Sequence, residues 1–338
     1  MFISNPFHID LGIDLGTANT IVYAKKRGFI YNQASYIALD QEGKIVAIGN
    51  SAKKMMGKTP VSIKVVRPLV DGAISDFEAG DAFIKGFIKQ AKISQIRIGR
   101  VVMGVPTQAS EVEKRAMIKS AMLAGAKKVY LIAEPMAAAI GLNHNVMGGS
   151  ANMIVDIGGG TTDIAVINYG GIVVDNTIRI AGDDLDKAIA SYINCKYKVK
   201  IGLVTAEKLK TKLINLSETN NSDVFTFKSL DSINGRVKKF EFPIEIFKEA
   251  IKEIIDGIIN AILHVLEILP VELSSDIINC GIILTGGGSQ LPGLDSMIEK
   301  KTGVIVHVAD NPLFSVADGI KKILHDLKYY NKIIIQSS

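Results

Sequence analysis

The sequence has no tryptophan, only two cysteines and no large excess of charge of either sign. Cys195 and Cys280 form no pairing or metal-binding pattern, and so few cysteines are typical of a reducing cytoplasm. The formal net charge is +5, and because the basic residues are scattered it gives no argument for nucleic-acid binding. The same mild positive bias suits an anionic membrane surface only weakly.

Long hydrophobic runs are also missing. We expect no signal peptide, because no basic segment followed by an apolar one opens the chain, and no transmembrane helix, because no apolar run is long enough. The chain does have length and apolar content, with 338 residues of which 48% are hydrophobic. These values argue against a disordered chain and allow two domains with a large core.

The stretch from Val155 to Val166 is the most informative part of the sequence. An apolar run leads into Asp156, then into three glycines and two threonines, and then into a second apolar run. This pattern predicts two strands joined by a tight turn. Glycines let backbone N–H groups converge on an anion, and a carboxylate at the end of a buried strand suits a metal ion or its waters. We therefore predict a clamp for a phosphate chain with its magnesium.

The same pattern occurs earlier, over residues 13–23. The matched pairs are Asp14 with Asp156, Gly16 with Gly158, and Thr20 with Thr162. Their constant spacing indicates an internal duplication, so two clamps would grip a phosphate chain from opposite sides. A third glycine turn, over residues 284–289, follows another apolar strand and is predicted to accept the base or ribose.

Other interpretations of these glycines fit less well. A single acid–glycine turn is more often an ordinary hairpin, but two matched copies and a third turn favour phosphate binding. Gly57-Lys58-Thr59 ends like a Walker loop, but Ala52 stands where the first glycine belongs. Asp163 stands at the third glycine position of a dinucleotide-binding fingerprint, and that turn leads into a strand-like run.

Strands and helices alternate along the rest of the chain in two similar halves. Ser110 and Glu113 form a capping box for one helix, and Ser51 is predicted to cap another. The predicted strands lie in 11–24, 29–39, 44–49, 101–105, 129–132, 171–180, 223–228, 282–284 and 304–308, and the predicted helices span 52–57, 78–92, 111–124, 136–142, 185–194, 205–214, 245–269, 292–301 and 315–327. This order predicts an α/β fold with two sheet-based lobes and a cleft between them. A ligand in the cleft would touch both lobes and couple its chemistry to their closure.

One polar stripe on the long predicted helix has two interpretations. Metal binding is one, and a solvated helix face is the more common one. The stripe consists of Asp256, Asn260, His264 and Glu267.

Taken together, these motifs resemble the actin-like ATPase superfamily, whose fold is two-lobed and ribonuclease H-like, and within it the bacterial cytoskeletal MreB family. The segments that carry the resemblance are residues 11–20, 67–72, 124–132, 134–140, 156–162, 170–174 and 284–288. They extend from near residue 9 to near residue 325, so the resemblance covers almost the whole chain.

The resemblance implies duplicated sheet domains, each with a small outer subdomain, and a nucleotide in the central cleft. The first lobe would span 1–145, with an inner subdomain of 1–30 and 77–145 and an outer subdomain of 31–76. The second lobe would span 146–318, with an inner subdomain of 146–181 and 245–318 and an outer subdomain of 182–244. Residues 319–338 would form a C-terminal helix and tail that return to the first lobe.

The resemblance also implies a slow ATPase, which converts ATP to ADP and phosphate and is coupled to polymerisation. Asp14 and Asp156 would hold Mg²⁺ through waters. Glu134 would position or activate the attacking water, and Thr161 would polarise it. A second interpretation of Glu134 is an acid at a helix start, where the helix dipole favours it.

The implied nucleotide contacts fall into three groups. The first phosphate loop would be Gly16, Thr17, Ala18 and Asn19, and the second Gly158, Gly159, Gly160 and Thr161. The nucleoside would be approached by Gly182, Asp183, Glu207, Lys210, Gly286, Gly287, Gly288 and Ser289.

Two positions depart from the family pattern. The family usually has a second acid where this chain has Ala133, and commonly glutamate where it has Asp163. The glycines and threonines of the loops are kept, so the departures bear on hydrolysis more than on binding. The hydrolysis rate depends on placing a water within about an ångström.

Members of the family form paired protofilaments and bind membranes directly. The expected partners are therefore further copies of the chain, an anionic membrane surface and other morphogenetic proteins, but no nucleic acid. The expected location is the cytoplasm at the inner face of the cell membrane, and the expected role is governing cell shape or, in a wall-less bacterium, moving the cell.

Two stretches supply the candidate membrane contacts, Phe2 and Ile3 among the apolar residues at the start of the chain, and Ile93 and Ile96. The two isoleucines lie among Lys92, Arg97 and Arg100, and apolar residues beside basic ones suit an anionic lipid surface. A second interpretation is that the isoleucines complete the neighbouring core elements. Lys328 to Gln336 mixes Lys, Tyr and Ile in a similar way and is either a further contact or a simple tail.

Three other classes share parts of this pattern. A chaperone ATPase would carry a peptide-binding domain after its two lobes. A sugar or acetate kinase would need a catalytic aspartate and a substrate pocket, for which the sequence has no separate candidate. A division protein like FtsA would have an altered subdomain and a terminal amphipathic helix, which are not evident here.

Overall fold

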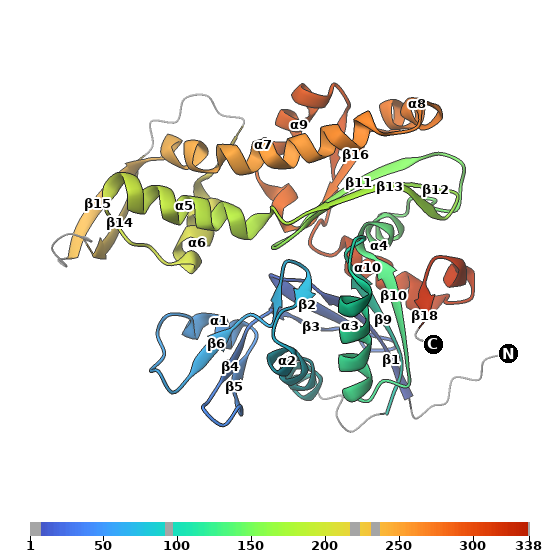
Figure 1. Cartoon of the computed structure of the whole chain (residues 1–338), viewed down its shortest axis with the longest axis horizontal. Helices are drawn as coiled ribbons and strands as arrows, with labels where there is room; N and C mark the ends of the chain where they lie inside the picture. The colour runs from blue at the N-terminus through green and yellow to red at the C-terminus, as the bar shows by residue number, and fades with distance from the viewer. Residues whose placement is uncertain (1–7, 92–96, 217–223, 231–236, 337–338) are drawn as a thin grey trace.

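The computed structural model describes residues 8–91, 97–216, 224–230 and 237–336. Two lobes lie one above the other in Figure 1, and each is built around one large sheet. The first lobe, drawn from blue to green, contains the N-terminal half of the chain, and the second contains most of the rest.

The sheet of the first lobe has six strands in the order β18-β10-β9-β1-β2-β3. β1, β2 and β3 pair antiparallel, whereas β1, β9 and β10 run parallel to one another. Their bounds are β1 (His8–Leu15), β2 (Asn19–Ala24), β3 (Gly28–Ala34), β9 (Arg97–Val105) and β10 (Lys128–Ala133).

The sheet of the second lobe has five strands in the order β13-β12-β11-β16-β17. β11, β12 and β13 pair antiparallel, and β16 and β17 continue the sheet parallel to β11. Their bounds are β11 (Asn152–Ile157), β12 (Thr162–Asn168), β13 (Gly171–Ile178), β16 (Ile282–Thr285) and β17 (Val306–Val308).

The two sheets repeat the same arrangement of three antiparallel strands followed by two parallel ones. The match extends to the strand register, because Leu15 pairs with Thr20 in one lobe and Ile157 pairs with Thr162 in the other. The matched residues of the two glycine turns, which share one constant offset in the sequence, therefore lie at equivalent positions of a duplicated sheet.

Each lobe carries a smaller outer part, on the left of Figure 1. In the first lobe it is a three-stranded sheet, β4 (Ile37–Leu39), β5 (Ile45–Ile48) and β6 (Lys64–Val66), with helix α1 (Asn50–Met55). A short hairpin, β7 (Leu69–Val70) and β8 (Ala73–Ile74), leads back to the main sheet. In the second lobe the outer part contains α5 (Gly182–Tyr197), α6 (Leu203–Leu213) and the hairpin β14 (Val224–Leu230) and β15 (Val237–Pro243).

The remaining helices belong to the lobes or lie between them. The first lobe has α2 (Phe77–Gln90) and α3 (Glu111–Leu123), and the second has α7 (Glu245–Glu267), α8 (Val271–Cys280), α9 (Leu294–Thr302) and the 3₁₀ helix η1 (Gly287–Gln290). α4 (Glu134–Gly141) and α10 (Ser315–His325) pack against each other where the lobes meet (Figure 1).

Local sequence signals had mixed outcomes. The predicted capping box of Ser110 and Glu113 is confirmed at the start of α3. The prediction that Ser51 caps α1 is wrong. Gly49, with a φ of 70°, is the N-cap, and the Asn50 side chain accepts a hydrogen bond from Ala34 N instead. Helix α8 was not predicted, and the predicted polar stripe of α7 is partly or fully exposed, as a solvated face requires.

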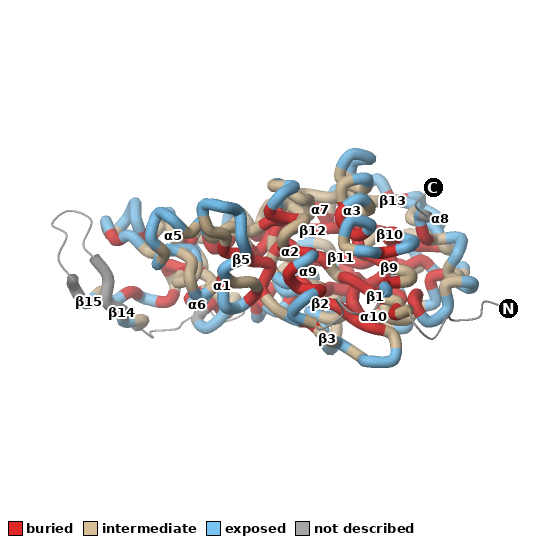
Figure 2. Tube along the Cα trace, turned by 90° about the horizontal axis from the view of Figure 1, so that it is seen from below, coloured by how far each residue is buried: buried red, intermediate tan, exposed pale blue. Residues whose placement is uncertain are grey.

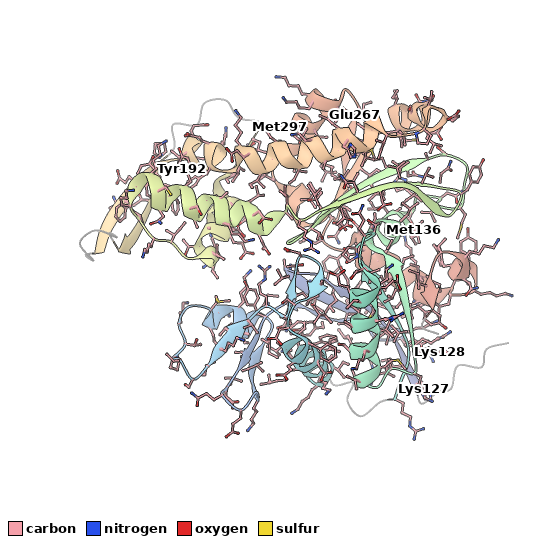
Figure 3. All side chains as sticks on the ribbon, viewed as in Figure 1. Lys127, Lys128, Met136, Tyr192, Glu267 and Met297 are labelled. Atoms are coloured by element: carbon pink, nitrogen blue, oxygen red, sulfur yellow. The ribbon has the colours of Figure 1, made fainter. Side chains whose placement is uncertain are left out.

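One hydrophobic core fills each lobe, and a third joins them. This third cluster contains Val102 from the first sheet, Ile154 and Ala165 from the second, and side chains of α4 and α10. Met136 of α4, labelled in Figure 3, belongs to it and lies between the lobes. Figure 2 shows the buried residues concentrated along the strands of both sheets. The lobes are thus tied together through buried apolar contacts as well as through the chain.

The C-terminal tail returns to the first sheet. The 3₁₀ helix η2 (Tyr329–Lys332) is followed by β18 (Ile335–Gln336), which pairs antiparallel with β10. None of the helices in the described part of the chain has the length and apolar content to cross a membrane. The candidate membrane residues Phe2, Ile3, Ile93 and Ile96 lie outside the described residues.

Candidate functional site

The turns after β1 and β11 meet where the two lobes touch. A Cβ built on Gly159 would lie 2.8 Å from the Cβ of Ala18, and one on Gly160 would lie 2.9 Å from Oγ1 of Thr17. Side chains at these two positions would hold the turns apart, so glycine is what permits their close approach. The structure thus brings together the two predicted phosphate loops, residues 16–19 and 158–161.

Carboxyl groups from four elements gather behind these turns, and burial raises the pKa of each. The pKa of Asp14 rises to about 7 and that of Asp156 to about 8, the latter helped by the charges of its neighbours. Burial also raises the pKa of Glu134 well above its ordinary value, and three neighbouring carboxylates raise it further. They are Asp163, Asp14 and Asp156.

Buried carboxylates that repel one another would be stabilised by a cation bound between them. The part of the chain that the structure describes contains no group of three or more His, Cys, Asp or Glu side chains arranged to hold a metal ion. A cation between Asp14 and Asp156 would therefore need most of its ligands from water and from a phosphate ligand. Mg²⁺ is bound in this way, by one or two carboxylates, several waters and phosphate oxygens.

Hydroxyl groups brace both turns from inside the fold. Oγ1 of Thr17 accepts a hydrogen bond from Gly72 N at 3.0 Å, which ties the first turn to the β7–β8 hairpin. Thr20 shares a 2.9 Å hydrogen bond with Ser35, and Thr162 donates to Ile180 O at 2.7 Å. Thr20 and Thr162 are fully buried, so these matched threonines stabilise the turns and do not contact a ligand.

The start of α5 is fixed to the second turn. Gly182 N donates to Gly158 O at 3.2 Å, and Asp183 N donates to Gly159 O at 2.8 Å. The structure therefore places Gly182 and Asp183, two predicted ribose neighbours, directly against the second glycine turn.

Arg67 and Asp183 form an ion pair between the lobes that sequence reasoning missed. Nη1 of Arg67 lies 2.7 Å and Nη2 3.1 Å from the two carboxylate oxygens of Asp183, and Nη2 also donates to Thr17 O. Arg67 thus joins the first turn to the helix that supports the second. Its position just before Pro68 in a family-like segment was the only signal in the sequence.

A second ion pair connects the outer parts of the lobes. Lys53 Nζ lies 2.7 Å from a carboxylate oxygen of Glu207. Lys210, one turn further along α6, donates to Gly182 O and pairs with Asp186 at 2.9 Å. The two predicted nucleoside residues of α6 therefore stand close to the start of α5 and to the opposite lobe.

The third glycine turn packs onto the second one. Gly286 has a φ of 80°, and a Cβ there would overlap with the Asp156 carboxylate and the Ile157 carbonyl. Ser289, also predicted at the nucleoside, is buried and donates to Gly286 O at 2.8 Å. Gly287 and Gly288 lie between them at the start of η1.

This geometry defines a class of protein. A duplicated sheet, two opposed glycine turns with an acid at the base of each, and a third glycine turn beside them are the features of an actin-like fold. The predicted α/β, two-lobed fold is confirmed.

Comparison with known proteins identifies the family. The MreB/Mbl protein family profile matches residues 8–332, and the chain belongs to that family. The cell shape-determining protein Mbl of Bacillus subtilis is 41% identical over 323 residues, which cover 95% of this chain and 97% of Mbl. The resemblance seen in the sequence is confirmed, and it decides against the chaperone, kinase and division-protein classes.

Solved structures give the same result. The MreB5 protein of Spiroplasma citri bound to ADP is 31% identical, with a TM-score of 0.90 over 96% of this chain and 98% of that one. The same protein bound to AMPPNP is 31% identical, with a TM-score of 0.91 over 97% of this chain and 99% of that one.

Proposed function

We propose that this protein binds ATP between its two lobes, hydrolyses it slowly and assembles into filaments whose formation depends on the bound nucleotide. The contact between the glycine turns at Ala18 and Gly159 carries this proposal, because it creates a paired donor surface for a phosphate chain. The ADP and AMPPNP bound to MreB5 support a nucleotide as the ligand. Membership of the MreB/Mbl family supports the filament.

Asp14 and Asp156 would hold Mg²⁺ through its water ligands. The ion would neutralise charge on the phosphates and on the carboxyl groups around it. The raised pKa values of the two acids support this assignment, because burial and mutual repulsion leave them in need of a positive partner.

Glu134 and Thr161 would act on the attacking water. Glu134 opens α4 beside the acids, and Thr161 closes the second glycine turn, so the two approach the terminal phosphate from different lobes. The water oxygen forms a bond to the γ-phosphorus while the bond to the β–γ bridging oxygen breaks. ADP and phosphate are released, and the proton lost by the water passes first to the carboxylate of Glu134 at the start of α4.

The nucleoside would lie between the start of α5, helix α6 and the third glycine turn. Gly182 and Asp183 would approach the ribose, Glu207 and Lys210 would approach the nucleoside from the outer part, and residues 286–289 would approach it from the inner part. The contacts of Lys210 with Gly182 and Asp186 support this, since they hold α6 against α5.

The cellular role would be to shape the cell, or to move it, from filaments at the inner face of the membrane. The relative from Bacillus subtilis is a cell shape-determining protein, which supports the first role. The apolar residues at Phe2 and Ile3, and the isoleucines Ile93 and Ile96 among basic residues, support the membrane contact.

One experiment tests these steps together. The purified chain is mixed with ATP and Mg²⁺ and sedimented, the pellet is imaged by negative stain, and phosphate release is followed in parallel. We expect filaments and slow phosphate release from the wild type. Glu134→Ala should bind ATP and form filaments with hydrolysis slowed about 100-fold. A soluble protein that neither binds nucleotide nor pellets with it would contradict the proposal, and an unchanged rate in Glu134→Ala would remove that residue from the mechanism.

A further inference from the structure

Asp163 is an acidic residue near the start of a strand that is otherwise largely apolar. It follows Thr162 at the start of β12, its exposed fraction is 1%, and it pairs with Asp156 in the strand register. Burial raises the pKa of its carboxyl group, and hydrogen bonds from three threonines oppose that rise. A buried carboxylate is costly unless donors surround it, so this one needs a reason to be there.

The donors come from both lobes. Oδ1 of Asp163 accepts hydrogen bonds from Thr107 N at 3.1 Å, from the Thr107 hydroxyl at 3.3 Å and from the Thr177 hydroxyl at 2.7 Å. Thr107 belongs to the first lobe, in the connection between β9 and α3, whereas Thr177 lies on β13 of the second. The hydroxyls of Thr107 and Thr177 are themselves 2.9 Å apart.

The side chain of Thr161, which closes the second glycine turn two residues before Asp163, also interacts with this carboxylate and opposes the rise in its pKa. The carboxylate therefore connects the other lobe to the hydroxyl that the proposed function places beside the attacking water. Thr161 and Thr177 also line a cavity of about 110 Å³ between the lobes, which Gly72 and Pro106 border from the first lobe.

We propose that Asp163 is a positioning residue that couples closure of the two lobes to ATP hydrolysis. With the lobes together, Thr107 and Thr177 hold the carboxylate in place, and the carboxylate accepts a hydrogen bond from the hydroxyl of Thr161. The lone pairs of that oxygen are then left to accept a hydrogen bond from the attacking water. When the lobes separate, Asp163 loses both bonds from Thr107, and the Thr161 hydroxyl is no longer held in one orientation. This role rests on the proposed ATP hydrolysis, which it regulates.

This role can be tested by replacing the carboxylate of Asp163 with an amide, which has nearly the same shape. An amide at this position keeps the shape of the side chain and one acceptor oxygen, but its nitrogen donates and cannot accept from a hydroxyl. Asp163→Asn should therefore leave the lobes folded and the nucleotide bound while the orientation of Thr161 is lost.

Asp175 provides the matched control. It lies on β13 and accepts a hydrogen bond from Gln108 Nε2 at 3.3 Å, so it also connects the lobes, but none of its described contacts is with Thr161. Asp175→Asn removes charge from the same contact between the lobes. It should hydrolyse ATP at the wild-type rate.

The experiment compares the wild type, Asp163→Asn, Asp175→Asn and Thr177→Val in single-turnover ATP hydrolysis, with the Kd for ADP and the melting temperature measured for each. We expect hydrolysis to be slower by about 10- to 100-fold in Asp163→Asn, with the Kd for ADP changed by less than about threefold. Thr177→Val, which removes one donor to Asp163, should lie between this variant and the wild type. It serves in place of Asp163→Asn if that variant does not fold.

Asp163→Asn with a wild-type rate would overturn the inference, as would an equal loss of rate in Asp175→Asn. A loss of rate that only follows a loss of ADP affinity would do the same, because it would indicate a binding role. A wild-type chain that binds ATP and releases no phosphate would overturn the proposed hydrolysis itself, and with it this role of Asp163.

Discussion

At the residue scale, the site depends on glycines that keep two backbones in contact. Gly159 is the clearest case, because the nearest atoms to its missing Cβ are the Cβ and the backbone N of Ala18, at 2.8 and 3.1 Å. Neither atom belongs to a flexible side chain that could turn aside. An alanine would have to move one turn away from the other by about 1 Å, and a shift of that size is enough to misplace bound phosphate groups.

Gly159→Ala should therefore weaken binding of Mg-ADP by about tenfold or more, measured as the Kd of a fluorescent ADP analogue. Gly202→Ala is the matched control. Gly202 has an ordinary φ of −80°, and a Cβ there meets no atom within 4 Å. Equal affinities in the two variants would show that the contact between the turns does not matter for binding.

The acids behind the turns predict how stability depends on pH. Without Mg²⁺, the folded chain holds protons on Asp14 and Asp156 that the unfolded chain has already released, because the pKa of both is raised from 3.8, to about 7 and about 8. Their contribution to stability is fully present below about pH 4 and is lost as the pH rises through these two values.

In EDTA and without nucleotide, the melting temperature should thus fall between pH 5.5 and pH 8.5. Asp156→Asn, which cannot ionise, should show a smaller fall over the same range. Adding Mg-ADP should flatten the curve of the wild type, because the ion stabilises the charged carboxylates. A melting temperature that rises with pH in the wild type alone would contradict the assignment of raised pKa values to these acids.

At the scale of helices and strands, local signals explain what the sequence predicts and what it misses. The helix start at Ser110 was predictable because both partners of the capping box lie within four residues. Ser51 was a wrong choice because the helix begins one residue earlier, at Asn50, whose side chain is held by Ala34 of β3, and because Gly49 is the N-cap. Helix α8 follows α7 almost directly, so the pattern of one helix obscured the start of the next.

The crossing of α4 and α10 depends on two glycines that face backbone atoms. A Cβ on Gly319 would overlap with the carbonyl oxygen of Ala137, and one on Gly141 would overlap with that of Ser315. Lys322 adds hydrogen bonds to the carbonyls of Ile140 and Gly141, which caps the end of α4. Since α4 begins with Glu134, this crossing fixes the helix that carries the proposed water-activating acid.

Gly319→Ala should lower the free energy of unfolding by about 1–3 kcal/mol, because backbone atoms must move to make room. Gly257→Ala is the matched control in a helix interior, where the nearest atom is the flexible end of Ile180 at 3.3 Å. That change should be neutral or stabilising by up to about 1 kcal/mol, from helix propensity alone. The melting temperatures of the two variants measure the difference, and a Gly319→Ala protein as stable as the wild type would show that the helices are free to separate.

At the scale of the whole molecule, the sequence predicts the duplication but not how the lobes are held together. Matched acids and glycines revealed the two turns, since each motif is contiguous in the chain. Arg67 and Asp183 are more than a hundred residues apart, and no local pattern indicates that they meet. Asp163 was noticed only as a mismatch to known sequence motifs, because its donors come from separate segments of the chain.

The Arg67–Asp183 pair is the contact most directly placed to control lobe closure. It is bidentate, its side chains are about one-fifth exposed, and it adds a hydrogen bond to the first glycine turn. Because the pair is largely shielded from water, removing one partner leaves an uncompensated charge between the lobes. Either single reversal, Arg67→Asp or Asp183→Arg, should therefore open the lobes and speed release of a fluorescent ADP analogue by about tenfold or more.

The double reversal, Arg67→Asp with Asp183→Arg, restores opposite charges across the same contact and should recover part of the slow release. If the double variant releases ADP more slowly than the two single effects together predict, the recovery comes from the restored ion pair. Any direct contact of Asp183 with the nucleotide would still be missing in that variant, so it could not explain the recovery. Reversing Lys239 and Glu241, an exposed ion pair within the second lobe, controls for charge change and should leave release unchanged. If the double reversal releases ADP as fast as the worse single variant, the ion pair does not hold the lobes closed, and closure depends instead on the shared apolar core around α4 and α10.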